Sequence, residues 1–345
     1  MAPPTPLLER YRDRLARPGE SFPVTLGEGS TPLIHARRLG AAIGLDHLYL
    51  KFEGTNPTGS FKDRGMVLAV NRALGSGARM VVCASTGNTS ASAAAYAAAA
   101  GLNCGVVLPA GKVARGKLAQ ALAAGAQLVM VEGNFDAALQ AVRALGEAGD
   151  GVVVNSINPD RLEGQQTVAW EIADALDGAP EAVALPVGNA GNITAAWRGF
   201  VSIGQRPRML GFQAAGAAPI VRGAPVPEPE TVATAIRIGN PASWEGATTA
   251  RDESGGLIES VTDAQILAAQ GYIARLEGIF CEPASAAGVA GVRQLAEAGR
   301  LDRSTSVVCI LTGHGLKDPD TAPGELGELG PVPATAEAIR RAIGA

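Results

Sequence analysis

The sequence NPTGSFKDRG, residues 56–65, carries the strongest local signal in the chain. It follows an apolar run that is typical of a strand, and it opens a stretch with the pattern of a helix. Asn, Pro, Thr, Gly and Ser form tight turns, and their side-chain oxygens can cap the first turn of a helix. Lys62 lies in that turn, where the positive end of the helix disfavours another positive charge. We therefore expect a lowered pKa and a nucleophilic amine at Lys62, although an ordinary surface lysine fits the same spacing.

Apolar runs alternate with helical stretches on both sides of this turn. We expect strands at residues 47–52, 79–84, 103–108, 126–131, 151–155, 182–187, 209–213 and 306–311. We expect helices at residues 63–74, 89–100, 116–124, 136–147, 162–176, 194–203, 263–276 and 284–298. Residues 221–252, rich in Gly, Pro and Thr, are expected to form a long surface loop or lid. Apolar strands separated by helices predict an α/β fold whose parallel sheets are covered by helices.

The composition favours a globular protein and argues against one that binds nucleic acid or a membrane. A length of 345 residues suggests two domains, and 47% apolar residues supply a sizeable core. The net charge of -4 gives no basic surplus for nucleic acid or an anionic membrane. No apolar stretch has the length of a membrane span. The first residues lack the pattern of a signal peptide, so the cytoplasm is the expected location.

Cysteine and histidine usage argues against disulfides and metal. The four cysteines form no CxxC pair, so we expect buried, reduced thiols at Cys83, Cys104, Cys281 and Cys309. The three histidines are too few and too scattered for a zinc site. No metal is therefore expected.

Three further polar turns follow expected strands. Residues 85–90, STGNTS, offer hydroxyl and backbone donors at a helix start and suit a carboxylate. Residues 188–194, GNAGNIT, let the backbone approach a single phosphate group, because neither a dinucleotide fingerprint nor a Walker lysine is present. Residues 311–315, LTGHG, add a hydroxyl, and His314 among them is expected to be structural. Taken alone, STGNTS fits an ordinary capped helix equally well.

All four turns lie at the carboxyl ends of strands, where parallel sheets form ligand crevices. Together they offer a reactive amine, a phosphate cradle, a carboxylate site and a lone hydroxyl. A phosphorylated carbonyl cofactor held through a Schiff base needs these groups, and pyridoxal phosphate is such a cofactor.

Nearly the whole chain resembles the threonine synthase family of fold-type II pyridoxal-phosphate enzymes. The similar blocks are residues 26–33, 51–65, 85–90, 132–136, 155–159 with Arg161, 188–192, 236–241, 282–285 and 311–315. The Ser-Phe-Lys core is shared with serine and threonine dehydratases. The blocks at 155–161, 236–241 and around Thr312 favour threonine synthases.

The resemblance implies a role for each matched residue. Lys62 would be the catalytic residue, joined to pyridoxal 5'-phosphate. Asn88 would hydrogen-bond the phenolate oxygen of the cofactor ring, and Thr312 its pyridine nitrogen. The cofactor phosphate would be held by Gly188, Asn189, Ala190, Gly191 and Asn192. The substrate carboxylate would be bound by Ser85, Thr86 and Thr89. The substrate phosphate would be bound by Asn155, Ser156 and Arg161, with Lys112 as a further candidate.

The reaction implied by the resemblance converts O-phospho-L-homoserine and water to L-threonine and phosphate, by γ-elimination and β-replacement. One alternative is a dehydratase that eliminates the β-hydroxyl of serine or threonine. It would share Lys62 and Asn88 but would not need Arg161. Another is a non-catalytic sensor of a phosphorylated metabolite, in which Lys62 would only contact a phosphate.

The resemblance also implies the architecture. We expect two three-layer α/β domains with mostly parallel sheets, similar to tryptophan synthase β, with the cofactor in the cleft between them. Residues 1–52 and 156–345 would form a large cofactor-binding domain, and residues 53–155 a small domain inserted in it. The family pattern implies a homodimer. The expected partner is a small-molecule substrate, with no nucleic acid and no membrane.

Overall fold

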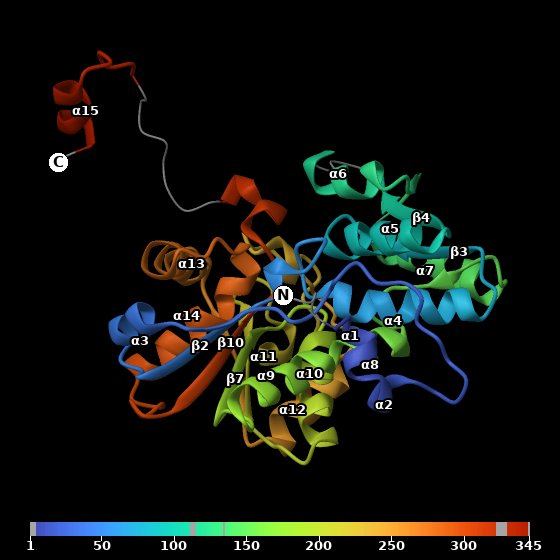
Figure 1. The fold of residues 1–345 in the computed structure, drawn as a ribbon, viewed down its shortest axis with the longest axis horizontal. Helices are drawn as coiled ribbons and strands as arrows, with labels where there is room; N and C mark the ends of the chain where they lie inside the picture. Colours follow the sequence, from blue (N-terminus) through green and yellow to red (C-terminus); the bar gives the residue numbers. More distant parts are fainter. Residues whose placement is uncertain (1–4, 111–114, 134, 322–329, 344–345) are drawn as a thin grey trace.

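The computed structural model describes residues 5–110, 115–133, 135–321 and 330–343 (Figure 1). Two β-sheets form its framework. The larger has six strands in the order β1-β2-β10-β7-β8-β9, and the smaller has four in the order β5-β4-β3-β6. Strand β1 runs antiparallel to β2, and all other neighbouring strands are parallel.

The six-stranded sheet is covered on both faces by helices. Its strands are β1 (Leu33–His35), β2 (His47–Phe52), β7 (Ala182–Pro186), β8 (Arg208–Ala214), β9 (Leu257–Val261) and β10 (Ser306–Leu311). Alternate residues of β7 point to opposite faces, as a strand requires. Val183 and Leu185 pack in one apolar cluster, and Ala182 and Ala184 pack in another. Helices α9 (Thr167–Leu176), α10 (Gly191–Ser202) and α12 (Trp244–Glu253) cover the first face. Helices α3 (Arg37–Ile43), α13 (Asp263–Glu277) and α14 (Pro283–Glu297) cover the second.

The four-stranded sheet is also a three-layer unit. Its strands are β3 (Met80–Ala84), β4 (Asn103–Pro109), β5 (Gln127–Val131) and β6 (Val152–Val153). Val81 and Cys83 of β3 pack with helices on one side, and Val82 and Ala84 pack with α7 (Phe135–Glu147) on the other. The helices opposite α7 are α4 (Lys62–Gly75), α5 (Asn88–Ala100) and α6 (Arg115–Ala123).

Short elements complete the described chain. The helices are α1 (Leu7–Arg10), α2 (Arg12–Leu15), α8 (Pro159–Gln165), α11 (Pro219–Arg222) and α15 (Ala336–Ile343). Single 3-10 turns occur at Glu53–Thr55, Thr234–Ile236, Gly315–Lys317 and Pro319–Thr321.

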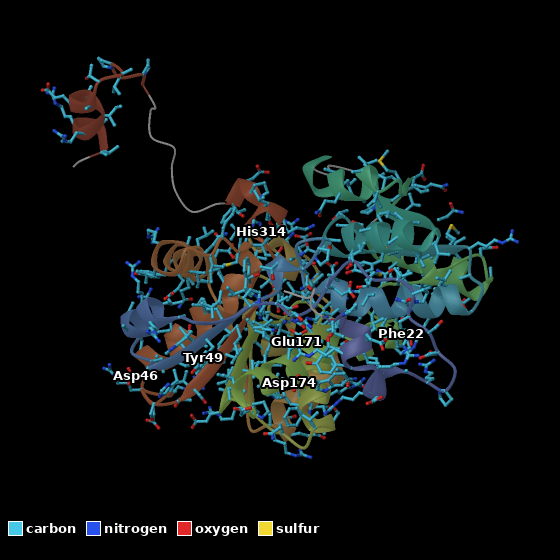
Figure 2. The ribbon with its side chains drawn as sticks, viewed as in Figure 1. Phe22, Asp46, Tyr49, Glu171, Asp174 and His314 are labelled. Atoms are coloured by element: carbon cyan, nitrogen blue, oxygen red, sulfur yellow. The ribbon has the colours of Figure 1, made fainter. Side chains whose placement is uncertain are left out.

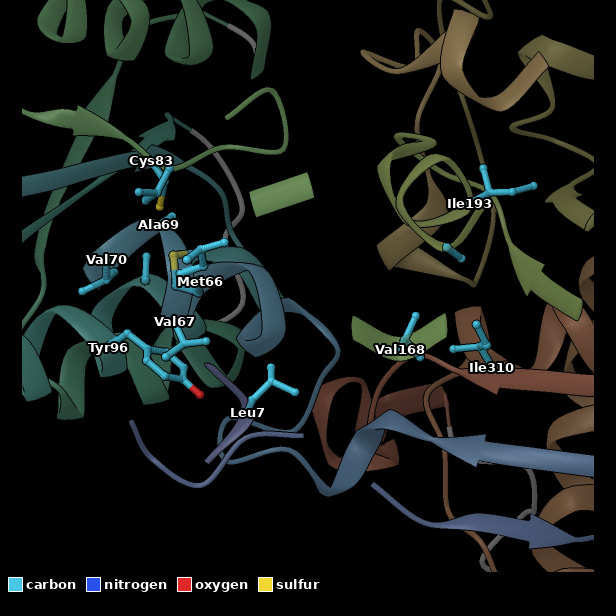
Figure 3. Close-up of a cluster of buried hydrophobic side chains, with 14 of the residues drawn as sticks. Leu7, Met66, Val67, Ala69, Val70, Cys83, Tyr96, Val168, Ile193 and Ile310 are labelled. Atoms are coloured by element: carbon cyan, nitrogen blue, oxygen red, sulfur yellow. The ribbon is translucent and has the colours of Figure 1, made fainter. Parts of the chain in front are cut away.

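One cluster of buried apolar side chains extends from one sheet to the other (Figure 3). It includes Met66 of α4 and Tyr96 of α5 beside the small sheet, and Val168, Ile193 and Ile310 beside or within the large one. The two sheets therefore share part of one hydrophobic core.

Every expected strand is present, but three expectations need correction. The expected strand 151–155 is limited to Val152–Val153, and the expected helix 162–176 is divided between α8 and α9. Residues 244–252 are not loop, because α12 begins at Trp244 and buries Ala247 and Ala250. Two strands, β1 and β9, have no counterpart among the expected ones; β1 has only three residues, and Glu259 and Ser260 interrupt the apolar pattern of β9.

The four cysteines are buried and free, as expected. Cys83 and Cys104 lie in the small sheet, Cys309 lies in the large sheet, and Cys281 precedes α14. Burial raises the pKa of all four thiols. Among the described helices, none combines the length and the apolar character needed to cross a membrane.

A buried ion network fixes the start of α4 against the large sheet. The Arg64 guanidinium contacts the carboxylates of Glu53, at 2.6 Å, and Glu171, at 2.8 Å. Lys51 Nζ lies 2.8 Å from the same Glu171 carboxylate, and Glu171, labelled in Figure 2, is buried. Burial alone would raise the pKa of Glu171, but Arg64 and Lys51 outweigh it and hold that pKa well below its usual value.

Replacing Glu171 by glutamine should lower the free energy of unfolding by about 3–5 kcal/mol, because two buried cations lose their shared counter-charge. Urea denaturation near neutral pH measures this loss. The contribution of Glu171 is present above the usual glutamate pKa and is lost as the pH falls below it. Glu297→Gln, at the exposed Arg293–Glu297 pair, is the control and should change stability little. An equal, small change in both variants would contradict the prediction.

Candidate active site

Lys62 lies in the first turn of α4, as the sequence predicts, and is its first residue, one position before the expected helix start at residue 63. Part of its side chain is accessible, but its amine is enclosed by protein, and Nζ lies 4.3 Å from the centre of the Phe61 ring. Burial and the charge of Arg161 lower the pKa of Lys62 to about 7, although Glu282 acts in the opposite direction. The expected direction is therefore confirmed. The causes are tertiary contacts, which the position at a helix start does not reveal.

The turn that carries Lys62 is fixed to the end of the large sheet. The Phe61 amide donates to the Thr312 carbonyl, and the His314 amide donates to the Gly59 carbonyl. His314 Nδ1 accepts from the Leu316 amide at 3.1 Å, which fits its expected structural role. The expected capping of α4 by a side-chain oxygen is absent, because no side chain bonds at its N-cap, Phe61.

Asp63 stabilises the same turn from inside. Its carboxylate accepts from the Thr58 amide at 2.7 Å, from the Thr58 hydroxyl at 2.6 Å and from the Ser92 hydroxyl at 2.6 Å. Burial raises the pKa of Asp63 to about 6, against these hydrogen bonds. Ser60 Oγ is buried nearby without a partner.

The STGNTS turn lies between β3 and α5. Asn88 is the first residue of α5, and no side chain caps this helix. Ser85, Thr86 and Thr89 are partly exposed. The open helix start suits an anion, as expected. Asn88 Nδ2 donates to the Glu282 carboxylate, at 3.1 Å and 3.3 Å.

The glycine-rich turn at 188–192 lies between β7 and α10. A Cβ on Gly188 would lie only 2.9 Å from the Cα of Ile236, so only glycine fits there. Ala190 adopts a left-handed conformation, with φ of 65°. Asn192 Nδ2 is buried without a hydrogen-bond partner, which leaves a donor for an anionic ligand.

Arg161 lies in α8 and is fully buried. Its Nη1 donates to the Val154 carbonyl at 3.0 Å, but its Nε and Nη2 atoms have no partner. Burial lowers the pKa of Arg161 to about 10, and the nearby Asp63 carboxyl group acts in the opposite direction. A buried cation with free donors, acting on Lys62, is a suitable site for a phosphate.

Asn155 and Ser156 are engaged by neighbouring residues. The Asn155 amide exchanges two hydrogen bonds with the main chain of Ala84, at 2.9 Å and 3.0 Å. The Ser156 hydroxyl accepts from Asn189 Nδ2, which joins the two predicted phosphate sites. Lys112 lies outside the described residues.

Thr312 follows β10 and is 4% exposed. Its hydroxyl lies 2.9 Å from Ser285 Oγ and 3.4 Å from Glu282 Oε1. The sequence interpretation gives no role to Glu282 or Ser285, although both lie in the similar block 282–285. The sequence signal that could have drawn attention to Glu282 is an acidic residue directly before a proline that starts a helix.

These groups fit a phosphorylated aldehyde such as pyridoxal phosphate. Lys62 supplies an amine, the 188–192 turn has a free donor at Asn192, and Thr312 supplies a hydroxyl. Among the described residues, no group of three or more His, Cys, Asp and Glu side chains could hold a metal. Two surface hollows, of about 670 and 500 Å³, lie beside α7 and between α10 and α12, away from Lys62.

Comparison with known proteins agrees with this chemistry. The family model "Pyridoxal-phosphate dependent enzyme" matches residues 24–313. A threonine synthase from Mycobacterium leprae is 54% identical over 345 residues, which is 98% of this chain and 96% of that protein. A threonine synthase from Halalkalibacterium halodurans is 55% identical over 321 residues, 92% of this chain and 90% of that protein.

Solved structures share the fold. A mutant of O-ureido-L-serine synthase, bound to O-ureido-L-serine, superposes with a TM-score of 0.75 at 21% identity, and covers 92% of this chain and 97% of that one. Maize serine racemase gives 0.73 at 21% identity, with 86% and 89% covered. The predicted fold class, that of fold-type II pyridoxal-phosphate enzymes with mostly parallel three-layer sheets, is confirmed. Because the family model matches most of its length, the chain belongs to the pyridoxal-phosphate dependent enzymes.

Proposed function

We propose that the protein is a threonine synthase that converts O-phospho-L-homoserine and water to L-threonine and phosphate. Relatives named as threonine synthases, 53–55% identical over most of the chain, support this activity. The structural observation that carries it is the buried Arg161 guanidinium. Two of its nitrogens lack a partner, and its charge acts on Lys62. A substrate phosphate bound there would lie close to the reacting amine.

Pyridoxal phosphate, when bound, supplies an aldehyde that links to amines and a conjugated ring that accepts electrons released at the substrate. Lys62 is the group that we propose to move protons. With a pKa of about 7, its amine is largely neutral above that pH and can remove the proton at the substrate Cα. Phosphate leaves from Cγ and water adds at Cβ, so the reaction also needs proton transfers at these two carbons. We propose that the same amine carries them out.

The remaining residues are proposed to bind and orient. The 188–192 turn would hold the cofactor phosphate, and Asn88 and Thr312 would contact its ring. Ser85, Thr86 and Thr89 would bind the substrate carboxylate at the open start of α5. Arg161 would bind the substrate phosphate together with Ser156 and Asn155. Asn155 retains a second N–H and a second lone pair beyond its bonds to Ala84.

The domain boundaries remain those predicted from the sequence. We infer that residues 53–155 form a small domain inserted in a large one made of residues 1–52 and 156–345, with the cofactor in the cleft between them. All strands of the four-stranded sheet lie between Met80 and Val153, which supports this division. We also propose a homodimer, from the family resemblance, and a cytoplasmic location, which four free thiols favour.

The assay for this function uses the purified protein with O-phospho-L-homoserine. Equal amounts of phosphate and threonine are expected. Release of a keto acid from threonine or serine, without phosphate release, would instead indicate a dehydratase. Borohydride reduction tests the sensor alternative, because a threonine synthase retains the pyridoxyl mass on Lys62. A protein that retains no such mass and releases no phosphate would overturn the proposal.

A further inference from the structure

Glu282 is a buried acid without a role in the function described so far. It directly precedes α14 and is 3% exposed. Its amide donates to the Gly313 carbonyl at 3.0 Å. A Cβ on Gly313 would lie only 2.5 Å from Glu282 Oε1, so the loop after β10 leaves room for this carboxyl group only because residue 313 is glycine.

The Glu282 carboxyl group contacts one residue beside each of the two sheets. Asn88, at the start of α5, donates to it at 3.1 Å and 3.3 Å. Thr312, which follows β10, donates at 3.4 Å and is also 2.9 Å from Ser285 Oγ. These are the two residues proposed to contact the phenolate oxygen and the pyridine nitrogen of the cofactor. One carboxyl group therefore lies in contact with both.

We propose that Glu282 is a positioning residue for the cofactor ring: it orients the Asn88 amide and the Thr312 hydroxyl and places an acidic charge close to Lys62. This inference rests on the proposed roles of Asn88 and Thr312. It does not depend on which substrate the enzyme uses.

The orientation of Asn88 follows from the chemistry of a carboxylate. An ionised carboxylate only accepts hydrogen bonds, so it fixes the Nδ2 side of the Asn88 amide toward itself. One N–H then bonds Glu282, and the second remains for the phenolate oxygen. Without Glu282, the amide can flip and present its oxygen to that phenolate, which is repulsive.

The effect on Thr312 depends on the proton of Glu282. The Thr312 hydroxyl has one proton, which cannot serve Glu282 and the ring nitrogen together. A protonated Glu282 leaves that proton available, and an ionised one competes for it. Burial raises the pKa of Glu282, so its carboxylate takes up a proton at a higher pH than an exposed glutamate does.

Several groups face Glu282 from other elements. Asn88 and the charges of Lys317 and Lys62 lower its pKa, and Asp318 raises it. Lys62 in turn faces Arg161, which lowers its pKa, and Glu282, which raises it. Removal of the acid should therefore lower the pKa of Lys62.

The test compares Glu282→Gln and Glu282→Ala with Glu297→Gln, an exposed glutamate on the same helix. Glutamine keeps the size and one acceptor for Asn88 but removes the charge, whereas alanine removes both. The first readout is the rate of Lys62 acetylation against pH in the cofactor-free protein, followed by mass spectrometry. The second is the affinity for pyridoxal phosphate and the visible band of the loaded protein.

The wild type should show a labelling midpoint near pH 7. Glu282→Gln should lower this midpoint by about one unit and keep most of the cofactor affinity. Glu282→Ala should also weaken cofactor binding about tenfold and shift the visible band. In turnover, kcat should fall about tenfold or more in Glu282→Gln, with KM nearly unchanged.

The inference is overturned if Glu282→Gln matches Glu297→Gln in labelling midpoint and visible band. If Glu282→Ala does not fold, the isosteric glutamine variant alone decides. Neither spectral nor labelling readout uses phosphohomoserine. A wild type that binds cofactor without making threonine would therefore refute the proposed function and leave this test intact.

Discussion

Replacing Lys62 by alanine should abolish threonine formation and the covalent attachment of the cofactor. Lys62 supplies both the amine that holds the aldehyde and the base that moves protons at the substrate. A buried amine with a pKa of about 7 suits both tasks. We expect the release of phosphate from O-phospho-L-homoserine to fall by at least about 10⁴-fold. Borohydride reduction should then leave no pyridoxyl mass on the protein.

Lys62→Arg is the matched control for charge. Arginine keeps a cation at the start of α4 but offers no nucleophilic amine, so it should be as inactive as alanine. If Lys62 only contacted a phosphate, arginine would preserve function. An alanine variant with wild-type threonine output would refute the catalytic role.

Replacing Arg161 by methionine should lower kcat/KM for O-phospho-L-homoserine by about 10³-fold. Its two unpartnered nitrogens are the donors that we assign to the substrate phosphate, and each charge-assisted hydrogen bond contributes strongly to binding. Inorganic phosphate should raise the Tm of the wild type by binding the folded state. That shift should be absent in the methionine variant.

Stability separates this role from a structural one. The Arg161 guanidinium makes one hydrogen bond, to Val154, while its Nε and Nη2 atoms are buried without a partner. Methionine should therefore change the free energy of unfolding by about 1 kcal/mol at most. It should also raise the pKa of Lys62, opposite to Glu282→Gln. Arg303→Met, at an exposed ion pair, is the control. Wild-type kcat/KM with an intact phosphate shift would contradict the assignment.

Much of this architecture could be predicted because its signals are local. Strands β2, β7 and β10 are largely apolar runs, and the Lys62 turn combines strand end, tight turn and helix start within a few residues. Helix α12 gives no such signal, because only two small residues, Ala247 and Ala250, are buried.

The contacts between distant segments could not be predicted in this way. The low pKa of Lys62 results from enclosure and from Arg161, which is distant along the chain. The amide of Asn155 bonds Ala84, and Glu282 contacts Asn88. Such contacts form only when distant segments come together in the fold. The periodic pattern of apolar residues, which predicts helices and strands, does not reveal them.

Because the four thiols are buried in or beside the two sheets, their reactivity reports where the folded protein opens locally. Two of them lie in the four-stranded sheet, and the other two lie in or beside the six-stranded one. Alkylation requires a thiolate that a reagent can reach. Each pair of thiols therefore reacts only when its own sheet separates from the helices that cover it. Pulsed alkylation followed by mass spectrometry would measure how fast each sheet opens, without any engineered cysteine.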